Sequence, residues 1–126
     1  PFFQHLQGYL EEQRIAPLYW KVTATDTQFV KSSNNEVVVT LPIAGDHDSS
    51  DYFVIQFMRD AASGSLALNA QGFWLSGTNA AAYQLIEGML PNLATFDKAW
   101  YAYEWVDADG DKAPDLDEMH LKASGL

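Results

Sequence analysis

The residues of this chain that are best suited to chemistry lie near its C-terminal end. Seven carboxylates occur between positions 104 and 118, and Lys112 is the only basic residue among them. Carboxylates at this density repel one another unless a cation lies between them. Ca²⁺ takes about six to eight hard oxygen ligands, and alternate aspartates in a tight loop can turn their carboxylates toward one ion. The seven residues are Glu104, Asp107, Asp109, Asp111, Asp115, Asp117 and Glu118.

The segment 107–118 resembles the twelve-residue calcium loop of EF-hand proteins. It also looks like the Asp-rich calcium loops of dockerin and thrombospondin type 3 repeats. Carried over position by position, the resemblance implies side-chain ligands, one backbone carbonyl ligand, one ligand that binds directly or through water, and a closing bidentate carboxylate. In that order these are Asp107, Asp109 and Asp111, then Ala113, Asp115 and Glu118.

Two positions of this loop depart from the family pattern. Lys112 occupies the sixth position, where the family uses glycine for a sharp turn, and Pro114 replaces the usual branched apolar residue. The flanking segments are typical of strands, not helices, and no second loop is present. The alternative interpretation is a solvated hairpin loop, because Asp, Gly and Pro favour turns for purely local reasons.

A second candidate feature is an aromatic stripe directly before this loop. Trp100, Tyr101, Tyr103 and Trp105 place aromatic rings on both faces of one expected strand. Aromatic residues are enriched at binding hot spots, so Tyr101, Tyr103 and Trp105 beside an acidic loop would suit a basic, partly apolar protein partner. The alternative is that the strand is buried on both faces, because large aromatic side chains usually serve the core.

The elements that must position these residues follow from hydrophobic periodicity. Apolar residues at three- and four-residue spacing predict a helix over 2–10 that stops near Pro17, and a second helix that starts at Thr78 or Asn79 and ends before Pro91. Alternation and turn residues predict strands over 18–25, 28–31, 36–41, 52–59, 65–70, 73–75, 99–106 and 119–123. We therefore expect a single α+β domain over 1–126, with an antiparallel sheet of about five to seven strands and two helices packed on one face.

Composition excludes several classes of function. The chain has 7 Lys and Arg against 17 Asp and Glu, which gives a net charge of −10 and disfavours binding to nucleic acid phosphates. The absence of cysteine removes disulfides, Cys-ligated zinc and thiol catalysis. No apolar run reaches the roughly 18 residues of a membrane span. The N-terminal residues lack the cationic start of a secretory signal, so we expect a cytoplasmic location.

The remaining polar motifs carry weaker signals. Asp46, His47, Asp48 and Asp51 could offer ligands to a transition metal, but an exposed polar loop is the favoured interpretation of these residues. The GxxxxG spacing over 72–77 lacks the lysine of a phosphate-binding loop, and we interpret it as a buried strand and a turn. No histidine lies at the spacing of a known catalytic triad motif.

Three classes of function remain open from the sequence. The leading hypothesis is a small, acidic, non-enzymatic binding protein, such as an inhibitor or immunity-type partner of a basic protein. The second is a calcium-binding domain that uses 107–118, in which Ca²⁺ orders the loop without acting as a sensor. The third is a small-molecule binder or enzyme with a cavity between the sheet and the helices.

Overall fold

The computed structural model describes residues 15–126, which form an α+β fold with seven strands in two antiparallel sheets. The smaller sheet contains β1 (Leu18–Val22), β2 (Asp26–Lys31) and β3 (Val37–Pro42) in that order. A bulge between Phe29 and Val30 shifts the register of β2 against β3. Two consecutive hairpins make up this sheet, as the polar turn residues between its strands require.

The larger sheet has four strands in the order β5-β4-β6-β7. Its members are β4 (Ser50–Arg59), β5 (Leu66–Gly72), β6 (Trp100–Val106) and β7 (Met119–Gly125). Both central strands, β4 and β6, are almost continuously buried, whereas the outer strand β7 is mostly exposed. The chain runs through helical segments between β5 and β6, so strands that are far apart in sequence become neighbours.

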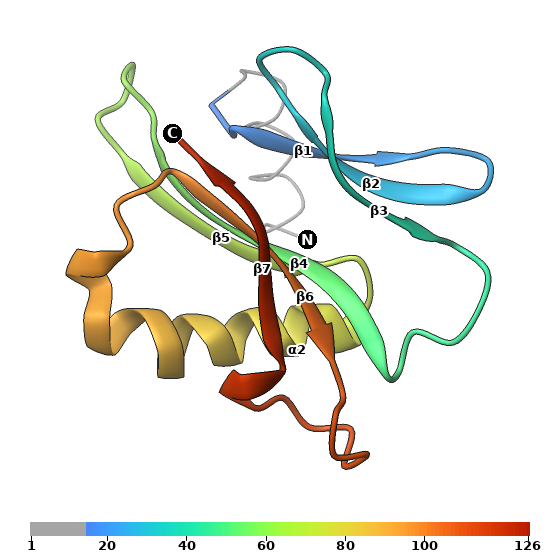
Figure 1. Cartoon of the computed structure of the whole chain (residues 1–126). Coiled ribbons are helices and arrows are strands. Elements are labelled where there is room, and N and C mark those ends of the chain that lie inside the picture. The colour runs from blue at the N-terminus through green and yellow to red at the C-terminus, as the bar shows by residue number, and fades with distance from the viewer. Residues whose placement is uncertain (1–14) are drawn as a thin grey trace.

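Those helical segments cover one face of the larger sheet. The α-helix α2 (Leu75–Tyr83) continues into a π-helical segment, η1 (Gln84–Met89), and a 3-10 segment, η2 (Leu90–Thr95). Figure 1 shows α2 below the larger sheet and β1, β2 and β3 above it. No helix in the described part of the chain is long and apolar enough to span a membrane.

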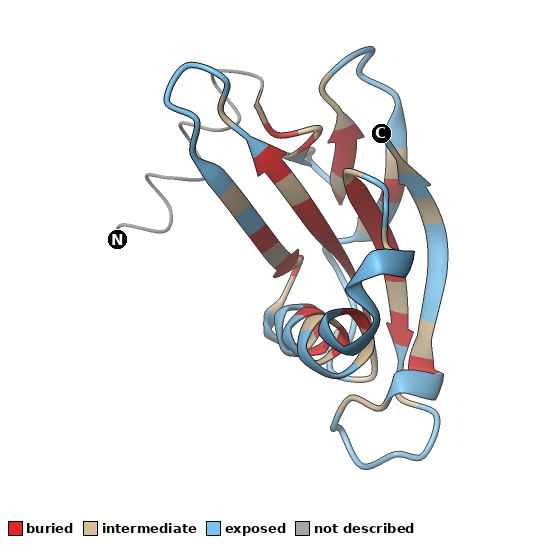
Figure 2. Ribbon diagram, turned by 90° about the vertical axis from the view of Figure 1, so that its left-hand side faces the viewer, coloured by how far each residue is buried: buried red, intermediate tan, exposed pale blue. Residues whose placement is uncertain are grey.

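The larger sheet therefore has a hydrophobic core on each face. On the helix side, Phe53 and Ile55 of β4 pack with Met89 and with alternate residues of β6. On the other side, Val54 of β4 packs with Phe29 of the smaller sheet and with Trp100 and Ala102 of β6. Figure 2 shows the buried residues concentrated on the inner strands, between the layers. Burial on both faces explains why the central strands contain near-continuous apolar runs.

The structure confirms the α+β class and corrects its arrangement. The seven strands form two sheets, of three and four strands, where one sheet was expected. Residues 15–126 contain one α-helix, and the helix expected over 2–10 lies outside the described residues. The second face of the larger sheet is covered by β1–β3. Local alternation predicts a strand equally well for one sheet or two, which is why the sequence pattern did not separate them.

The start of α2 is a second correction. Residues 73–75 were expected to form a strand, but α2 already begins at Leu75, before the expected caps Thr78 and Asn79. A carboxylate from another element explains the difference. Asp51 of β4 is buried, and its Oδ2 accepts hydrogen bonds from the backbone N–H of Trp74 at 2.8 Å and of Gly77 at 2.9 Å. A carboxylate at this point satisfies N–H groups that the first turn of a helix leaves unpaired.

Glycine is required where this carboxylate meets the helix. A Cβ atom at position 77 would lie 2.3 Å from Oδ2 of Asp51, and one at position 72 would lie 2.3 Å from the backbone carbon of Gly77. Burial raises the pKa of Asp51, while the N–H groups of Trp74, Tyr52 and Gly77 act in the opposite direction. The GxxxxG spacing over 72–77 thus permits close packing of the end of β5 against α2.

We predict that Asp51→Ala lowers the free energy of unfolding by about 2–3 kcal/mol, because it leaves buried N–H groups at the start of α2 without an acceptor. Urea denaturation of both proteins measures the difference. Ser76→Ala is the matched control, since the Ser76 hydroxyl lies 3.5 Å from Oδ2 of Asp51 and donates mainly to the carbonyl of His47 at 2.6 Å. Equal stability of the two variants would show that the carboxylate does not cap α2.

Candidate functional site

The acidic loop, which we define as Asp107–Glu118, connects β6 to β7 and lies at the lower end of the molecule in Figure 1. The backbone N–H of Asp107 donates to the carbonyl of Ser49 at 2.8 Å, and the ammonium of Lys112 contacts the hydroxyl of the same serine. A short 3-10 segment, η3 (Leu116–Glu118), closes the loop before β7. The loop is therefore attached to the segment that precedes β4.

Aspartate side chains organise the first half of the acidic loop. The carboxylate of Asp107 accepts hydrogen bonds from the N–H of Gly110 and of Lys112, both at 3.1 Å. Asp109 and Asp111 each accept one from the N–H two residues further along, at 3.1 and 2.9 Å. These bonds draw the backbone around the carboxylates, as short polar side chains do in tight turns. Alternate aspartates consequently lie on the inside of the turn.

The departure at Lys112 does not prevent the sharp turn. Lys112 has a φ of 61°, and Gly110 has a φ of 77°, so both adopt the left-handed conformation. The sixth position of the acidic loop therefore has the conformation for which the EF-hand family uses glycine, although a side chain there costs about 1 kcal/mol. The sequence pattern suggested a misfit at this position, and the backbone accommodates it.

Glu118 closes the acidic loop from inside the protein. Its side chain is 1% exposed. Its Oε1 accepts hydrogen bonds from the indole N–H of Trp105 at 3.2 Å and the N–H of Asp115 at 2.9 Å, while its Oε2 accepts one from the N–H of Ala108 at 2.7 Å. Asp115 and Glu118 also form a reciprocal capping box around η3. The two ends of the acidic loop are thus held together by one buried carboxylate.

Five of the six expected ligand residues come together in two overlapping groups. Carboxylate oxygens of Asp107, Asp109 and Glu118 lie within 4.8 Å of one another, and so do those of Asp109, Asp111 and Asp115. Asp109 belongs to both groups. Ala113, the sixth expected ligand, would contribute its backbone carbonyl from the exposed side of the turn. Within each group, oxygens at this spacing could share a cation.

Crowding of negative charge is visible in the titration of Asp109. The N–H of Asp111 lowers the pKa of Asp109, but the carboxylates of Asp111 and Asp115 raise it more, to about 6. The hydrogen bond with the Asp111 carboxylate is the largest cause that raises this pKa, followed by burial and then by the hydrogen bond with Asp115. A cation bound beside these oxygens would favour the ionised form instead.

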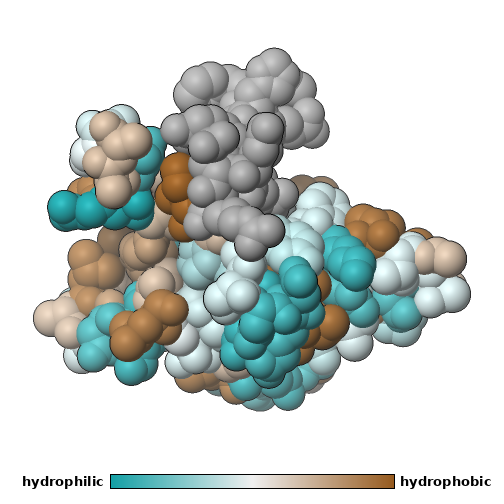
Figure 3. Space-filling view, turned by 90° about the horizontal axis from the view of Figure 1, so that it is seen from above, coloured by the Kyte–Doolittle hydropathy of each residue, from teal (hydrophilic) through white to brown (hydrophobic). Residues whose placement is uncertain are grey.

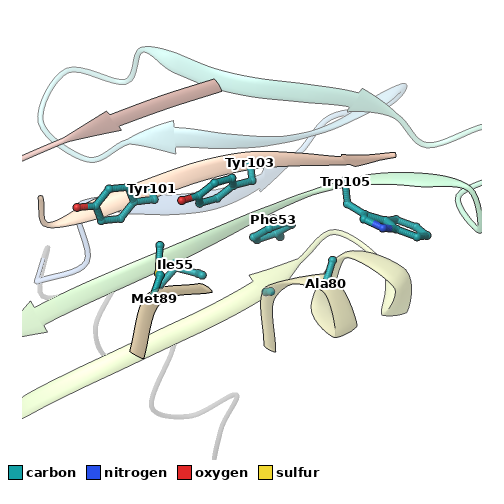
Figure 4. Close-up of a cluster of buried hydrophobic side chains, with 8 residues drawn as sticks. Phe53, Ile55, Ala80, Met89, Tyr101, Tyr103 and Trp105 are labelled. Carbon is teal, nitrogen blue, oxygen red and sulfur yellow. The ribbon is translucent and has the colours of Figure 1, made fainter. Parts of the chain in front are cut away.

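The expected partner-binding aromatics lie in the core. Tyr101, Tyr103 and Trp105 are 5%, 6% and 1% exposed, and all three point from β6 toward the helix side of the larger sheet (Figure 4). The ring of Tyr103 stacks on Phe53 at 5.1 Å. These three side chains are therefore not available as a contact surface, because strand alternation turns them all to the face that α2 and η1 cover.

A histidine, a carboxylate and a hydroxyl meet at the start of α2, and in residues 15–126 no hydrogen bond joins the histidine ring to the hydroxyl. Ser76 donates to the backbone carbonyl of His47 and lies near Asp51. The His47 ring stacks on Trp74 at 3.5 Å, and its Nε2 lies 2.9 Å from the carbonyl of Ile43. A nucleophile must hydrogen-bond to the base that activates it. Here the ring contacts a carbonyl, so this cluster serves as the cap of α2.

The comparisons with known proteins add no residue role. Neither protein-family models, nor curated proteins, nor solved structures gave a match to this chain.

We predict that Asp109 titrates near pH 6 in Ca²⁺-free protein and that Asp111→Asn lowers its pKa, because the substitution removes a neighbouring carboxylate and keeps the backbone N–H. Since the folded pKa lies above the ordinary value of 3.8, the contribution of Asp109 to stability is complete below that pH and is lost as the pH rises through about 6. Carboxyl NMR titration measures both values. Asp117→Asn is the control and should leave the titration unchanged; an equal effect of the two variants would contradict the assignment.

Proposed function

We propose that this protein is a non-enzymatic binding protein whose acidic loop holds one Ca²⁺ ion. The observation that supports the proposal most is the convergence of five carboxylates from twelve consecutive residues, in two groups whose oxygens lie within 4.8 Å. These carboxylates stand at the positions that the EF-hand resemblance implies. Hard oxygen ligands in this number are what Ca²⁺ requires.

Each ligand has a defined role in this proposal. Asp107, Asp109 and Asp111 bind through one oxygen each, since the turn hydrogen bonds leave oxygen lone pairs free for the ion. Asp115 binds directly or through water, and Ala113 contributes its carbonyl. Glu118 binds through both oxygens; its three N–H donors leave part of the roughly four lone-pair sites of a carboxylate available.

The donor set favours Ca²⁺ over other common cations. The acidic loop contains no histidine or cysteine, which are the preferred ligands of zinc. Mg²⁺ requires near-ideal octahedral geometry at about 2.0–2.1 Å and retains several waters. A loop that combines a backbone carbonyl with a bidentate glutamate matches the larger, more flexible coordination of Ca²⁺.

The ion would order the β6–β7 hairpin instead of acting as a conformational switch. The acidic loop is flanked by strands, and a calcium sensor needs a helix pair that opens on binding. Glu118 contacts Trp105, which belongs to the helix-side core. Binding to the loop therefore stabilises the folded state through a residue that is already part of the core.

We predict that Ca²⁺ raises the melting temperature by roughly 5–10 °C at 100 times its Kd, because a ligand that binds only the folded state adds about 2.7 kcal/mol there. The double variant Asp109→Asn/Asp111→Asn should lose this shift while it keeps the turn hydrogen bonds, since an asparagine oxygen still accepts them. Thermal unfolding with and without Ca²⁺ measures the effect.

The matched control for this double variant removes two carboxylate charges from the loop that precedes β4. Asp46→Asn/Asp48→Asn should retain the full Ca²⁺ shift, and Mg²⁺ at equal concentration should give little shift. Loss of the shift in both double variants would indicate general charge screening and contradict the site. A Kd of roughly 10⁻⁷–10⁻⁵ M would suit the expected cytoplasmic location, whereas roughly 10⁻⁴–10⁻³ M is typical of extracellular calcium modules.

A second candidate function is recognition of a basic partner by the acidic end of the protein. The loop that carries Asp46 and Asp48 lies beside the acidic loop, since Ser49 contacts both Asp107 and Lys112. Asp46, Asp48, Asp109, Asp111 and Asp117 are all exposed. Charge of one sign gathered on one end accelerates association with an oppositely charged partner. The partner would contact this acidic surface and not Tyr101, Tyr103 and Trp105, whose rings are buried.

We predict that a fluorescein-labelled oligolysine peptide binds Ca²⁺-free protein with an affinity that falls as salt concentration rises. Asp46→Asn/Asp48→Asn should weaken this binding more than Glu36→Gln/Glu87→Gln, which removes the same charge elsewhere. Fluorescence anisotropy measures both. Equal effects of the two double variants would show that net charge alone attracts the peptide and that the acidic end is not a recognition surface.

A further inference from the structure

The two sheets part at the end of the molecule opposite the acidic loop and leave a cleft of about 660 Å³. Trp100, the first residue of β6, lines this cleft, whereas the acidic loop follows the last residue of that strand. The smaller sheet contributes the β2–β3 turn from Lys31 to Asn34, and the larger sheet contributes the end of β4 and the end of β7. This volume lies in the range of small-molecule sites, about 300–1,000 Å³.

The floor of the cleft is apolar. Met58 and Trp100 line it and are 5% and 4% exposed, and Ile15 and Pro17 add apolar surface from the segment before β1. The β2–β3 turn supplies polar groups at the rim, where Ser32 is fixed by donating its hydroxyl to the carbonyl of Ala16 at 2.7 Å. Figure 3 views the molecule from above, and outside the atoms drawn in grey it shows hydrophobic and hydrophilic residues side by side. An apolar floor with a polar rim is typical of small-molecule sites.

The charge of this cleft has the opposite sign to that of the protein. Two of the basic residues, Lys31 and Arg59, line it, and no Asp or Glu does so among the described residues. Lys31 is partly neutralised by Glu36 at 3.3 Å. Neither ion pair of the described residues includes Arg59. In a chain of net charge −10, a cleft to which residues 15–126 bring a guanidinium outside both of their ion pairs, and no carboxylate side chain, is a local exception.

We propose that this cleft binds a small amphipathic anion, whose apolar body lies on Met58 and Trp100 and whose anionic group pairs with the guanidinium of Arg59. Arginine is suited to this role because its planar fork of donors matches the oxygens of a carboxylate, sulfonate or phosphate. Lys31 and the β2–β3 turn contribute to the rim on the other side. This site is independent of the acidic loop and of the proposed calcium binding.

The test uses a pair of dyes that differ in charge, 1-anilinonaphthalene-8-sulfonate and the uncharged N-phenyl-1-naphthylamine. We expect saturable binding of the anionic dye at one site of the full chain. The increase in the fluorescence of the dye measures this binding. Arg59→Gln should weaken binding of the anionic dye by about fivefold, as expected for a partly exposed ion pair, and leave the uncharged dye unaffected. Lys21→Gln, at an exposed position of β1, removes the same charge outside the cleft and should change neither affinity.

A second pair of variants locates the dye. A smaller groove of about 320 Å³ shares Phe57, Met58 and Arg59 with the cleft but is otherwise lined by β5, including the exposed Leu68. Ser124→Trp, which places bulk at the rim of the cleft, should weaken binding of both dyes, whereas Leu68→Ser should not. The proposal is overturned if Leu68→Ser has the larger effect, if Arg59→Gln and Lys21→Gln act equally, or if no saturable binding occurs because another part of the chain fills the cleft.

Discussion

The acidic loop depends on the hydrogen bonds that the buried carboxylate of Glu118 accepts. It accepts the indole N–H of Trp105 and the backbone N–H groups of Ala108 and Asp115, so it joins both ends of the loop to the hydrophobic core. Removing a buried carboxylate with three donors costs more than the bonds themselves, because each donor is left unpaired away from water. The hydrogen bonds of Glu118 keep the two ends of the acidic loop together, and the turn between these ends carries the exposed aspartates.

The start of α2 uses the same physical device. Asp51 is buried in β4 and binds N–H groups of Trp74 and Gly77, as Glu118 binds N–H groups of its own loop. Each carboxylate replaces water for backbone groups that no strand or helix ladder satisfies. The difference lies in what surrounds them. Asp51 lies against Gly77 and Ser76, whereas Glu118 has carboxylate oxygens of Asp107 and Asp109 within 4.8 Å.

Elements with clear local alternation could be predicted from the sequence, and those held by distant partners could not. The strands β4, β6 and β7 follow from period-two patterns, and the structure has them near the expected positions. Residues 73–75 also fit a strand, but the Asp51 carboxylate, more than twenty positions away, starts a helix there. No local pattern carries that information. The division into two sheets was missed for the same reason, since each strand alternates alike in either arrangement.

The candidate site shows the same division. The sequence predicted which carboxylates of the acidic loop come together, because their positions lie within one continuous turn. The sequence did not predict the left-handed conformation of Lys112 or the burial of Glu118, since these depend on contacts with β6 and with Ser49. The aromatic stripe was placed on the correct strand, but its burial depends on which face α2 and η1 cover. The charge of the open cleft arises from segments that only the fold brings together.

Terbium luminescence tests the central claim most directly, because Tb³⁺ replaces Ca²⁺ in oxygen sites and is sensitised by a nearby indole. Trp105 contacts the proposed ligand Glu118 at 3.2 Å. Excitation of tryptophan should give emission that saturates at one Tb³⁺ per chain, is displaced by Ca²⁺, and is lost in Asp109→Asn/Asp111→Asn. Emission that does not saturate, or that persists in this double variant, would contradict a calcium site in the acidic loop.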